Sequence, residues 1–389
     1  MDAINQADFV ANEHAEGGRA ADEFVRRSGI RLYDARRRAR GAATNASGRY
    51  ERLSREREEA TTLDGAMPIE ELAPFKTEVS EEHPRTIISR NASPDLSFDR
   101  SINPYRGCEQ GCIYCYARPS HAYVGLSAGL DFEQRIFAKN GAADLLRKEL
   151  AAKSYVPRTI ALGANTDPYQ PIEKKREITR DLLKVLDETS HPVGIVTKST
   201  LVERDIDILS RMAERDLVKV AVSITTLDPV LARKMEPRAP TPERRLETIR
   251  KLSDAGIPVV VMVAPIIPGL TDHEVERILE AARAAGASEA GYVMLRLPRE
   301  VASLFKDWLL RHAPDRYRHV LSLLRSMRGG KDYDADFGKR QTGMGPYAWQ
   351  IGRRFEIATR RLQLNIARKK LDESRFKAPR DQGAQLALI

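Results

Sequence analysis

The sequence predicts an α/β fold built on a parallel sheet of about six strand–helix units. Short apolar segments alternate with amphipathic segments from residue 158 to residue 297, which is the pattern of buried parallel strands connected by surface helices. One more strand is expected just before residue 108, which brings the count to about six. That number is too small for the eight units of a closed TIM barrel.

The expected elements follow one another at regular spacing. Strands are predicted at residues 158–165, 192–198, 218–225, 258–266 and 289–297, and helices at residues 176–189, 201–215, 242–256 and 271–286. Gly256 closes the third of these helices, since glycine is common just past a helix end. Beyond the last strand, further helices are predicted at residues 300–313 and 350–365.

The chain divides into four parts. Residues 1–60 are rich in arginine and poor in aromatic residues, so we expect a partly disordered extension with one helix near residues 20–29. Residues 61–97 contain scattered prolines and form a lead-in segment. Residues 98–300 hold the sheet and its helices, and residues 301–389 form a basic, helical extension.

Positive charge is concentrated toward the two ends of the chain. The formal net charge is +9, yet residues 26–57 and residues 340–380 each carry a net charge of +8, which leaves −7 for the remainder. Basic flanks on an acidic body favour a polyanionic partner, DNA or RNA first. A solvated, arginine-rich face without a partner is the alternative interpretation.

The composition also bears on the compartment. No run of about 18 apolar residues occurs, so no membrane span is expected. The N-terminus lacks the apolar core of a secretory signal. The cysteines are clustered and odd in number, which argues against a disulfide framework and favours the reducing cytoplasm.

All three cysteines of the chain lie within eight residues. Cys108, Cys112 and Cys115 have the spacing C-x3-C-x2-C, and no fourth cysteine occurs in the 389 residues. Three thiolates on a [4Fe-4S] cluster would leave one iron open for another ligand. A Cys3His zinc site that uses His121 is an alternative, although structural zinc sites usually have a second, distant ligand pair. A chance cluster of cysteines is a further alternative.

With Tyr114 just before the last cysteine, this run resembles the signature of the radical S-adenosylmethionine (radical SAM) superfamily. The resemblance implies a [4Fe-4S] cluster on a partial (β/α)6 TIM-like barrel, with S-adenosylmethionine (SAM) chelated to the open iron. It also implies an external one-electron reductant, whose electron cleaves SAM to methionine and a 5′-deoxyadenosyl radical. Gly107 and Gly111 suit a loop that wraps closely around a cluster.

Longer motifs resemble one branch of that superfamily, the spore photoproduct lyase-like proteins. They are CIYCYARPSHAY, NTDPYQPIE, VTKS and VAPIIPGLTD, and the resemblance covers roughly residues 85–300. It implies a set of SAM-binding residues and two tyrosines on the radical path. The SAM-binding residues are Thr166, Lys198, Ser223 and Ala264, and the tyrosines are Tyr114 and Tyr116.

The residues themselves support part of this assignment. Functional groups of α/β barrels gather at the carboxyl ends of the strands, and Lys198 lies at the end of the strand predicted at residues 192–198. An ammonium at that place favours a carboxylate partner, because burying it unpaired is costly, and SAM supplies a carboxylate. Arg296 lies at the end of the last predicted strand, where it could bind a substrate anion or pair with Asp167.

One departure from the lyase pattern concerns the hydrogen-atom donor. The lyase-like pattern has a cysteine in the loop after the second strand, whereas this chain has Ala164. We therefore do not expect repair of spore photoproduct itself, and Tyr114, Tyr116 or Tyr169 are the candidate donors. The chain also lacks the Gly-Gly-Glu run with which many radical SAM proteins hold the SAM amino group.

Three functions remain open from the sequence. The first is a radical SAM enzyme that acts on nucleic acid. The second is a radical SAM enzyme that modifies a protein or a small molecule. The third is a nucleic-acid-binding protein without enzymatic activity, in which the cluster is structural.

Overall fold

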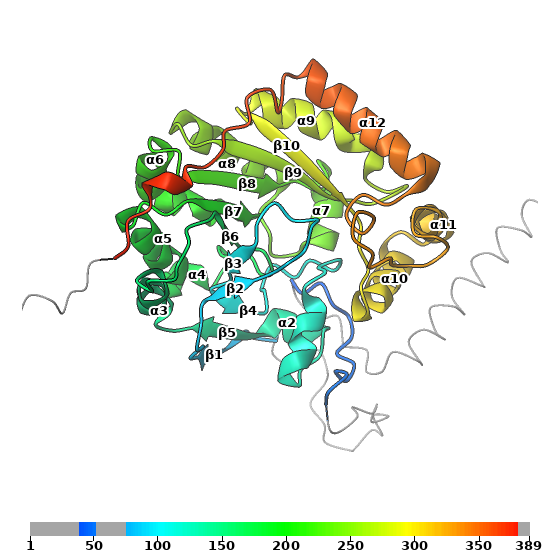
Figure 1. Cartoon of the computed structure of the whole chain (residues 1–389). Coiled ribbons are helices and arrows are strands. Elements are labelled where there is room, and N and C mark those ends of the chain that lie inside the picture. The colour runs from blue at the N-terminus through cyan, green and yellow to red at the C-terminus, as the bar shows by residue number, and fades with distance from the viewer. Residues whose placement is uncertain (1–38, 52–74, 380–389) are drawn as a thin grey trace, which may run out of the picture.

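A curved sheet of seven strands forms the centre of the computed structural model, which describes residues 39–51 and 75–379 (Figure 1). Its strand order is β10-β9-β8-β7-β6-β3-β2. The strands are β2 (Ile88–Arg90), β3 (Arg100–Ile102), β6 (Ile160–Leu162), β7 (Val193–Thr197), β8 (Val218–Ser223), β9 (Val259–Ile266) and β10 (Glu289–Met294). All neighbouring pairs from β3 to β10 are parallel, and β2 joins the edge antiparallel to β3. The expectation of six parallel strands is thereby confirmed.

Helices line the outer side of this sheet (Figure 1). They are α3 (Ala142–Leu150), α5 (Ile178–Glu188), α6 (Ile206–Ala213), α8 (Pro242–Asp254) and α9 (Val275–Ala284). The start of α8 shows how the sequence sets such boundaries. The Thr241 hydroxyl accepts the N–H of Arg244 at 3.4 Å, and Pro242 occupies the first turn, where its missing N–H costs nothing.

Some connections differ from the expected pattern. The helix predicted at residues 201–215 divides into a 3-10 helix, η3 (Thr200–Asp205), and α6, and the break coincides with Asp205, whose buried carboxylate binds Arg180 and Arg204. A short helix that was not predicted, α7 (Pro229–Met235), follows β8. Short α4 (Glu173–Arg176) and η4 (Asp272–Glu274) precede α5 and α9.

A second, small sheet was not predicted either. It has the order β1-β5-β4 and consists of β1 (Glu78–Glu82), β5 (Arg135–Lys139) and β4 (Tyr105–Arg106). Between β4 and β5 lie the cysteines, the 3-10 helix η2 (Arg118–Val124) and the short helix α2 (Leu130–Gln134). The cysteine loop is therefore held at both ends by strands of the same small sheet.

The last part of the described chain is helical. It comprises α10 (Glu300–His312), η5 (Pro314–Arg316), α11 (Tyr317–Ser326), α12 (Gly345–Arg361) and η6 (Glu373–Arg375). The helices expected at residues 300–313 and 350–365 correspond to α10 and α12, and α12 begins five residues earlier than predicted. Helix α12 runs beside α9 (Figure 1). Within residues 39–51 and 75–379, every helix is too short or too polar to cross a membrane.

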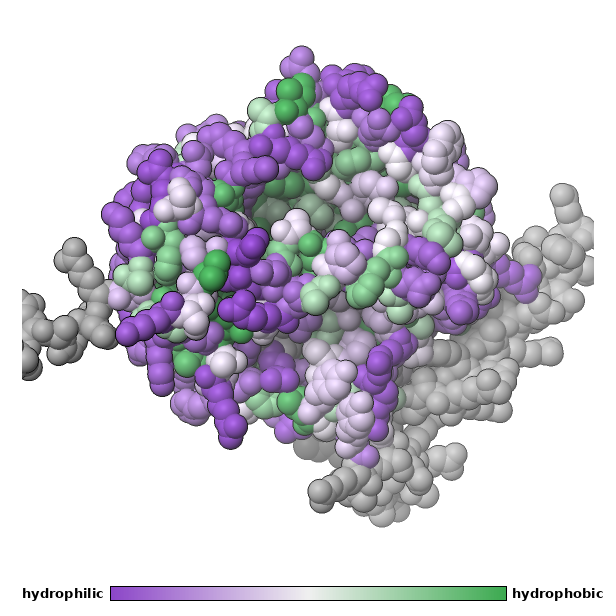
Figure 2. Space-filling model, viewed as in Figure 1, coloured by the Kyte–Doolittle hydropathy of each residue, from purple (hydrophilic) through white to green (hydrophobic). Residues whose placement is uncertain are grey.

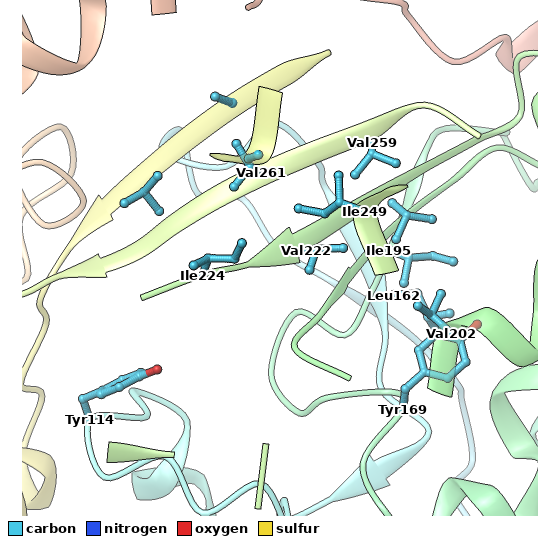
Figure 3. Close-up of a cluster of buried hydrophobic side chains, with 14 of the residues drawn as sticks. Tyr114, Leu162, Tyr169, Ile195, Val202, Val222, Ile224, Ile249, Val259 and Val261 are labelled. Atoms are coloured by element: carbon cyan, nitrogen blue, oxygen red, sulfur yellow. The ribbon is translucent and has the colours of Figure 1, made fainter. Parts of the chain in front are cut away.

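Apolar side chains fill the space between the sheet and its helices. Figure 3 shows Leu162, Ile195, Val222 and Val259 from four adjacent strands, all at most 1% exposed, with Ile249 of α8 packed against them. Figure 2 shows the molecule hollowed over its middle strands, with apolar side chains on the floor and hydrophilic ones around the rim. The helix expected near residues 20–29 lies outside the described residues.

Candidate active site

The three cysteines lie in a tightly wrapped loop between β4 and η2. All three thiols are free, and Cys108 is buried. Gly107 and Gly111 have φ angles of 79° and 70°, in the left-handed region that favours glycine. A Cβ on Gly111 would lie 2.9 Å from a carboxylate oxygen of Glu133. The loop therefore needs glycine at both positions, because of the backbone angles and, at Gly111, because of the close approach of Glu133.

A buried ion pair holds the loop in place. Arg118 and Glu133 are both fully buried, and the guanidinium lies 2.6 Å from the carboxylate. Arg118 also donates to four backbone carbonyls, among them Cys112 at 2.9 Å and Gly111 at 3.3 Å. This pair was not predicted, because nothing in the spacing of Arg118 and Glu133 in the sequence shows that they meet.

A segment from the arginine-rich extension packs against the same loop. The backbone N–H groups of Gly41 and Ala42 both donate to Glu133 at 2.8 Å. A Cβ on Gly41 would lie only 2.0 Å from the carbonyl oxygen of Gly111, so the two backbones touch. Residues 40–44 are buried. This part of residues 1–60 is thus a docked element of the site.

The cysteine loop suits a cluster better than a single metal ion. Burial raises the pKa of the Cys112 thiol to about 12 and raises the pKa of Cys108 and Cys115, so these thiols need a bound cation to ionise near neutral pH. Within the described residues, no group of three or more His, Cys, Asp or Glu side chains could hold one metal ion. Thiolates that bind different irons of a cluster need not converge on one point.

The zinc site with His121 is therefore wrong for the described residues. The Nε2 atom of His121 hydrogen-bonds the carbonyl of Arg135 at 3.0 Å, and its ring packs edge-on against Phe132, 5.4 Å between centroids. Burial lowers the pKa of His121 to about 4, so the ring is neutral at neutral pH. The side chain has a structural role in the wall behind the loop.

The predicted SAM-binding residues come together at one edge of the sheet. Thr166 follows β6, Lys198 follows β7, Ser223 ends β8 and Ala264 lies near the end of β9. Because these strands are adjacent and parallel, their carboxyl ends share the edge that carries the cysteine loop.

Lys198 faces the cysteine loop. Its ammonium lies 5.8 Å from the centroid of the Tyr114 ring, and its charge acts to lower the pKa of Cys112 against the effect of burial. Asp167 fixes the backbone here, since it accepts the N–H of Lys198 at 2.9 Å and the hydroxyl of Thr197 at 2.7 Å. An anionic group bound over the loop would find its counter-charge at Lys198.

The other three residues also have defined surroundings. The Thr166 hydroxyl donates to the carbonyl of Tyr105 at 3.0 Å, so it links the loop after β6 to β4. Ser223 is buried, and its carbonyl accepts from Arg245 at 3.0 Å. The carbonyl of Ala264 accepts from the Thr225 hydroxyl at 3.2 Å.

The two candidate tyrosines have different environments. Tyr114 is buried, and its hydroxyl donates to Glu236, which is paired with Arg245. Burial raises the pKa of Tyr114 most, and the negative charge of Glu236 raises it further. Burial alone would raise the pKa of Glu236, but Arg245 and Lys198 together hold it below its usual value. Tyr114 is therefore anchored in a buried, charged network.

Tyr116 lies at the open rim. Its side chain is 46% exposed, its hydroxyl donates to the carbonyl of Ala164, and the guanidinium of Arg296 lies 4.9 Å from its ring centroid. It therefore stands beside the position at which the lyase-like pattern has a cysteine. Tyr169 points elsewhere: it is fully buried, donates to Asp205 at 3.1 Å, and lies beside Leu162 and Val202, far from Tyr114 (Figure 3). Tyr169 is thus unsuited to donate hydrogen at this site.

Arg296 does not pair with Asp167, so that expectation was wrong. The Asp167 carboxylate instead accepts hydrogen bonds from Thr197 and Lys198 at the end of β7. Arg296 makes two long contacts of 3.5 Å, to Gln341 and Tyr333. The Nε atom of Arg296 is buried without a hydrogen-bond partner. Its role as a substrate-anion site remains a prediction.

Part of the basic charge of residues 340–379 pairs with acidic residues of the body of the chain. Arg354 pairs with Glu276 and Arg340 with Asp95, each at 2.6 Å. Further pairs of the same kind are Arg361–Glu280 and Lys369–Asp216. Much of this charge is compensated internally, which weakens the case for nucleic-acid binding through the C-terminal flank.

Comparison with known proteins settles the family. Residues 102–282 match the model of the radical SAM superfamily. The chain belongs to the radical SAM superfamily. An uncharacterized protein of Mycobacterium tuberculosis is 38% identical over 230 residues, which cover 58% of this chain and 68% of that relative. The radical SAM Nα-GlyT isomerase of Pseudomonas phage M6 is 23% identical over 252 residues, covering 61% of this chain and 48% of the phage protein.

The fold agrees with one solved radical SAM structure in particular. Spore photoproduct lyase complexed with dinucleoside spore photoproduct superposes with a TM-score of 0.52 at 16% identity, over 73% of this chain and 79% of the lyase. The partial TIM-like barrel of the radical SAM fold is thereby confirmed. The resemblance to the spore photoproduct lyase-like branch is confirmed at the level of the fold.

Proposed function

We propose that this radical SAM protein binds a [4Fe-4S] cluster through Cys108, Cys112 and Cys115 and cleaves SAM reductively. The supporting observation is a single wrapped loop with three free thiols, which faces the lysine that follows β7. In this superfamily the bound cluster and SAM supply a 5′-deoxyadenosyl radical, made with one electron from an external reductant, which abstracts a hydrogen atom from the substrate.

The protein's own residues would bind and orient the cofactors. Lys198 carries the charge that the SAM carboxylate needs, and Ser223, Thr166 and Ala264 lie along the same edge of the sheet. The Arg118–Glu133 pair and the backbone of Gly41 and Ala42 would hold the loop in place. We assign the four residues at the strand ends to SAM on this basis.

The two tyrosines would have separate tasks. Tyr116, with its phenol at the rim beside Ala164, is our candidate for the hydrogen-atom donor that replaces the missing cysteine. Tyr114 lies beneath Lys198 and is bound to Glu236. We assign it a place next to the cofactors, where it holds the lysine and the cysteine loop together.

Nucleic acid is the proposed substrate class. The solved lyase with this fold is described as bound to a dinucleoside photoproduct, and a phage relative is named as an isomerase of Nα-GlyT. The absence of a donor cysteine argues that the reaction differs from photoproduct repair. A protein or small-molecule substrate is the alternative that a substrate screen would reveal.

The test is the anaerobic formation of 5′-deoxyadenosine. Protein reconstituted with iron and sulfide is reduced with dithionite, supplied with SAM and assayed by mass spectrometry, with Cys112→Ala as the control. We expect deoxyadenosine from the wild type and none from the variant. A fully loaded cluster that cleaves no SAM, with or without added DNA and RNA, would favour a structural cluster in a nucleic-acid-binding protein.

A further inference from the structure

Two exposed tyrosines from distant parts of the chain stack on each other near the cysteine loop. Tyr50 belongs to the docked N-terminal segment and Tyr123 to η2, and their ring centroids lie 5.8 Å apart with an interplanar angle of 26°. The side chains are 58% and 65% exposed. Large aromatic rings stabilise a protein mainly when they are buried in a core or an interface. Stability of the core therefore does not explain why these two rings are exposed.

The pair is presented by a rigid support. The guanidinium of Arg49 lies 5.4 Å from the ring centroid of Tyr50 and 6.0 Å from that of Tyr123. Arg49 is itself fixed, since it pairs with Glu300 at 2.5 Å and donates to the carbonyl of Pro119 at 3.4 Å. These contacts hold the two rings at a defined place beside α10.

A turn fixes the backbone that carries Tyr50. Gly48 and Glu51 bond to each other through both backbone and side chain, at 3.0 and 2.8 Å. A Cβ on Gly48 would lie 2.6 Å from the carbonyl oxygen of Leu126, so the turn sits directly on the chain that follows η2. The ring of Tyr50 is therefore held in place before any ligand arrives.

The tyrosine pair is carried by segments that connect to the candidate active site. Helix η2 begins three residues after Cys115, and the partner of Arg49, Glu300, lies four residues after Arg296. Arg296 covers the ring of Tyr116 in the same manner, at 4.9 Å. Exposed tyrosines with an arginine over the ring thus occur twice, at Tyr116 and at the Tyr50–Tyr123 pair.

We propose that Tyr50 and Tyr123 form a stacking platform for an unpaired base of a single-stranded or locally opened nucleic acid. Nucleobases stack on exposed aromatic rings and on guanidinium groups with little dependence on sequence. An enzyme that acts on a base must reach it outside the base stack, and a platform beside the reaction site would hold a neighbouring base. The charge agrees, because residues 26–57, which include Tyr50, carry a net +8. The inference rests on nucleic acid as the substrate class.

The test is the binding of a fluorescent oligothymidine strand and its duplex to the reconstituted full-length protein. We expect the wild type to prefer the single strand. Tyr50→Ala and Tyr123→Ala should each weaken its binding by about 10-fold or more, the scale of losing one base–aromatic stack. Tyr50→Phe should bind the single strand as tightly as the wild type, since the aromatic ring is kept. Trp349→Ala is the matched control, because Trp349 is an equally exposed aromatic on α12, and it should leave binding unchanged.

Several results would overturn the platform. Alanine variants that bind as tightly as the wild type would do so, as would an equal loss with Trp349→Ala. If the alanine variants unfold at a lower temperature while binding normally, the rings are a packing surface for the chain's own residues. Failure of this inference is distinguishable from failure of the proposed function. SAM cleavage with strand binding that does not depend on the two tyrosines refutes the platform alone, and tyrosine-dependent binding without SAM cleavage refutes the radical chemistry alone.

Discussion

Replacing Arg118 with methionine should destabilise the cysteine loop strongly. The guanidinium is fully buried, and it bonds the buried Glu133 at 2.6 Å, two carbonyls of the cysteine loop and two carbonyls of the chain after η2. Methionine fills similar space but leaves the Glu133 charge without its partner, and breaking one side of a buried pair costs about 3–5 kcal/mol. The carboxylate keeps two N–H donors, from Gly41 and Ala42, so we expect a loss near 3 kcal/mol, at the lower end of that range.

The assay is chemical denaturation of the apoprotein, followed by iron analysis after reconstitution. Arg147→Met is the matched control, because Arg147 pairs with Glu188 on the surface, where both side chains are substantially exposed. Such pairs contribute about 1 kcal/mol or less. We expect Arg118→Met to lower the free energy of unfolding by roughly three times the control's loss or more, and to bind less iron per chain. Equal effects of the two variants, with full iron content in both, would refute the role assigned to Arg118.

Three further predictions concern cofactor binding, pH dependence and hydrogen transfer. Lys198→Met should weaken SAM binding to the reconstituted protein by about 10-fold or more in equilibrium dialysis, since a hydrogen bond to a charged group contributes about 1.5–3 kcal/mol. Burial lowers the pKa of His191 from 6.5 to about 4. Between those values the unfolded state binds more protons, so His191 stabilises the fold above pH 6.5 and this contribution is lost as the pH falls toward 4. From pH 7 to pH 5, His191→Gln should therefore lose about 2 kcal/mol less stability than the wild type in denaturation curves. Tyr116→Phe keeps the ring beneath Arg296, and it should lower the yield of modified nucleic acid per deoxyadenosine formed, measured by mass spectrometry.

Each of these predictions has a contradicting result. Unchanged SAM affinity in Lys198→Met would remove the lysine from the SAM site. Parallel stability curves of His191→Gln and the wild type between pH 7 and pH 5 would show that the histidine titrates normally when folded. A full yield of product from Tyr116→Phe would exclude its phenol as the hydrogen-atom donor.

The parts of the structure that depend on local pattern were predictable. Strands β6 and β9 read IAL and VVVMVAPI, which are continuous apolar runs, and such runs are typical of a parallel sheet that is covered by helices. The cysteine loop was found because its chemistry lies within eight residues. The small sheet was missed because β1 reads EVSEE, in which three of five residues are glutamates and no apolar run exists.

The parts that depend on contacts between distant residues were not predictable. Nothing in the arginine-rich extension shows that Gly41 and Ala42 donate to Glu133, some 90 residues away in the chain. The pairing of Arg354 with Glu276 could not be predicted either, and it compensates one positive charge of the basic C-terminal flank. In the C-terminal flank, part of the net charge counted from the sequence is therefore compensated by acidic residues of the body.

The most direct test of the account is whether SAM binds to the cluster. We would record the EPR spectrum of the dithionite-reduced, reconstituted protein before and after SAM is added. Three cysteine ligands and an open iron predict a clear change in the spectrum on adding SAM. An unchanged spectrum at full cluster occupancy would mean that the fourth position is not available to SAM, and the proposed radical chemistry would then be wrong.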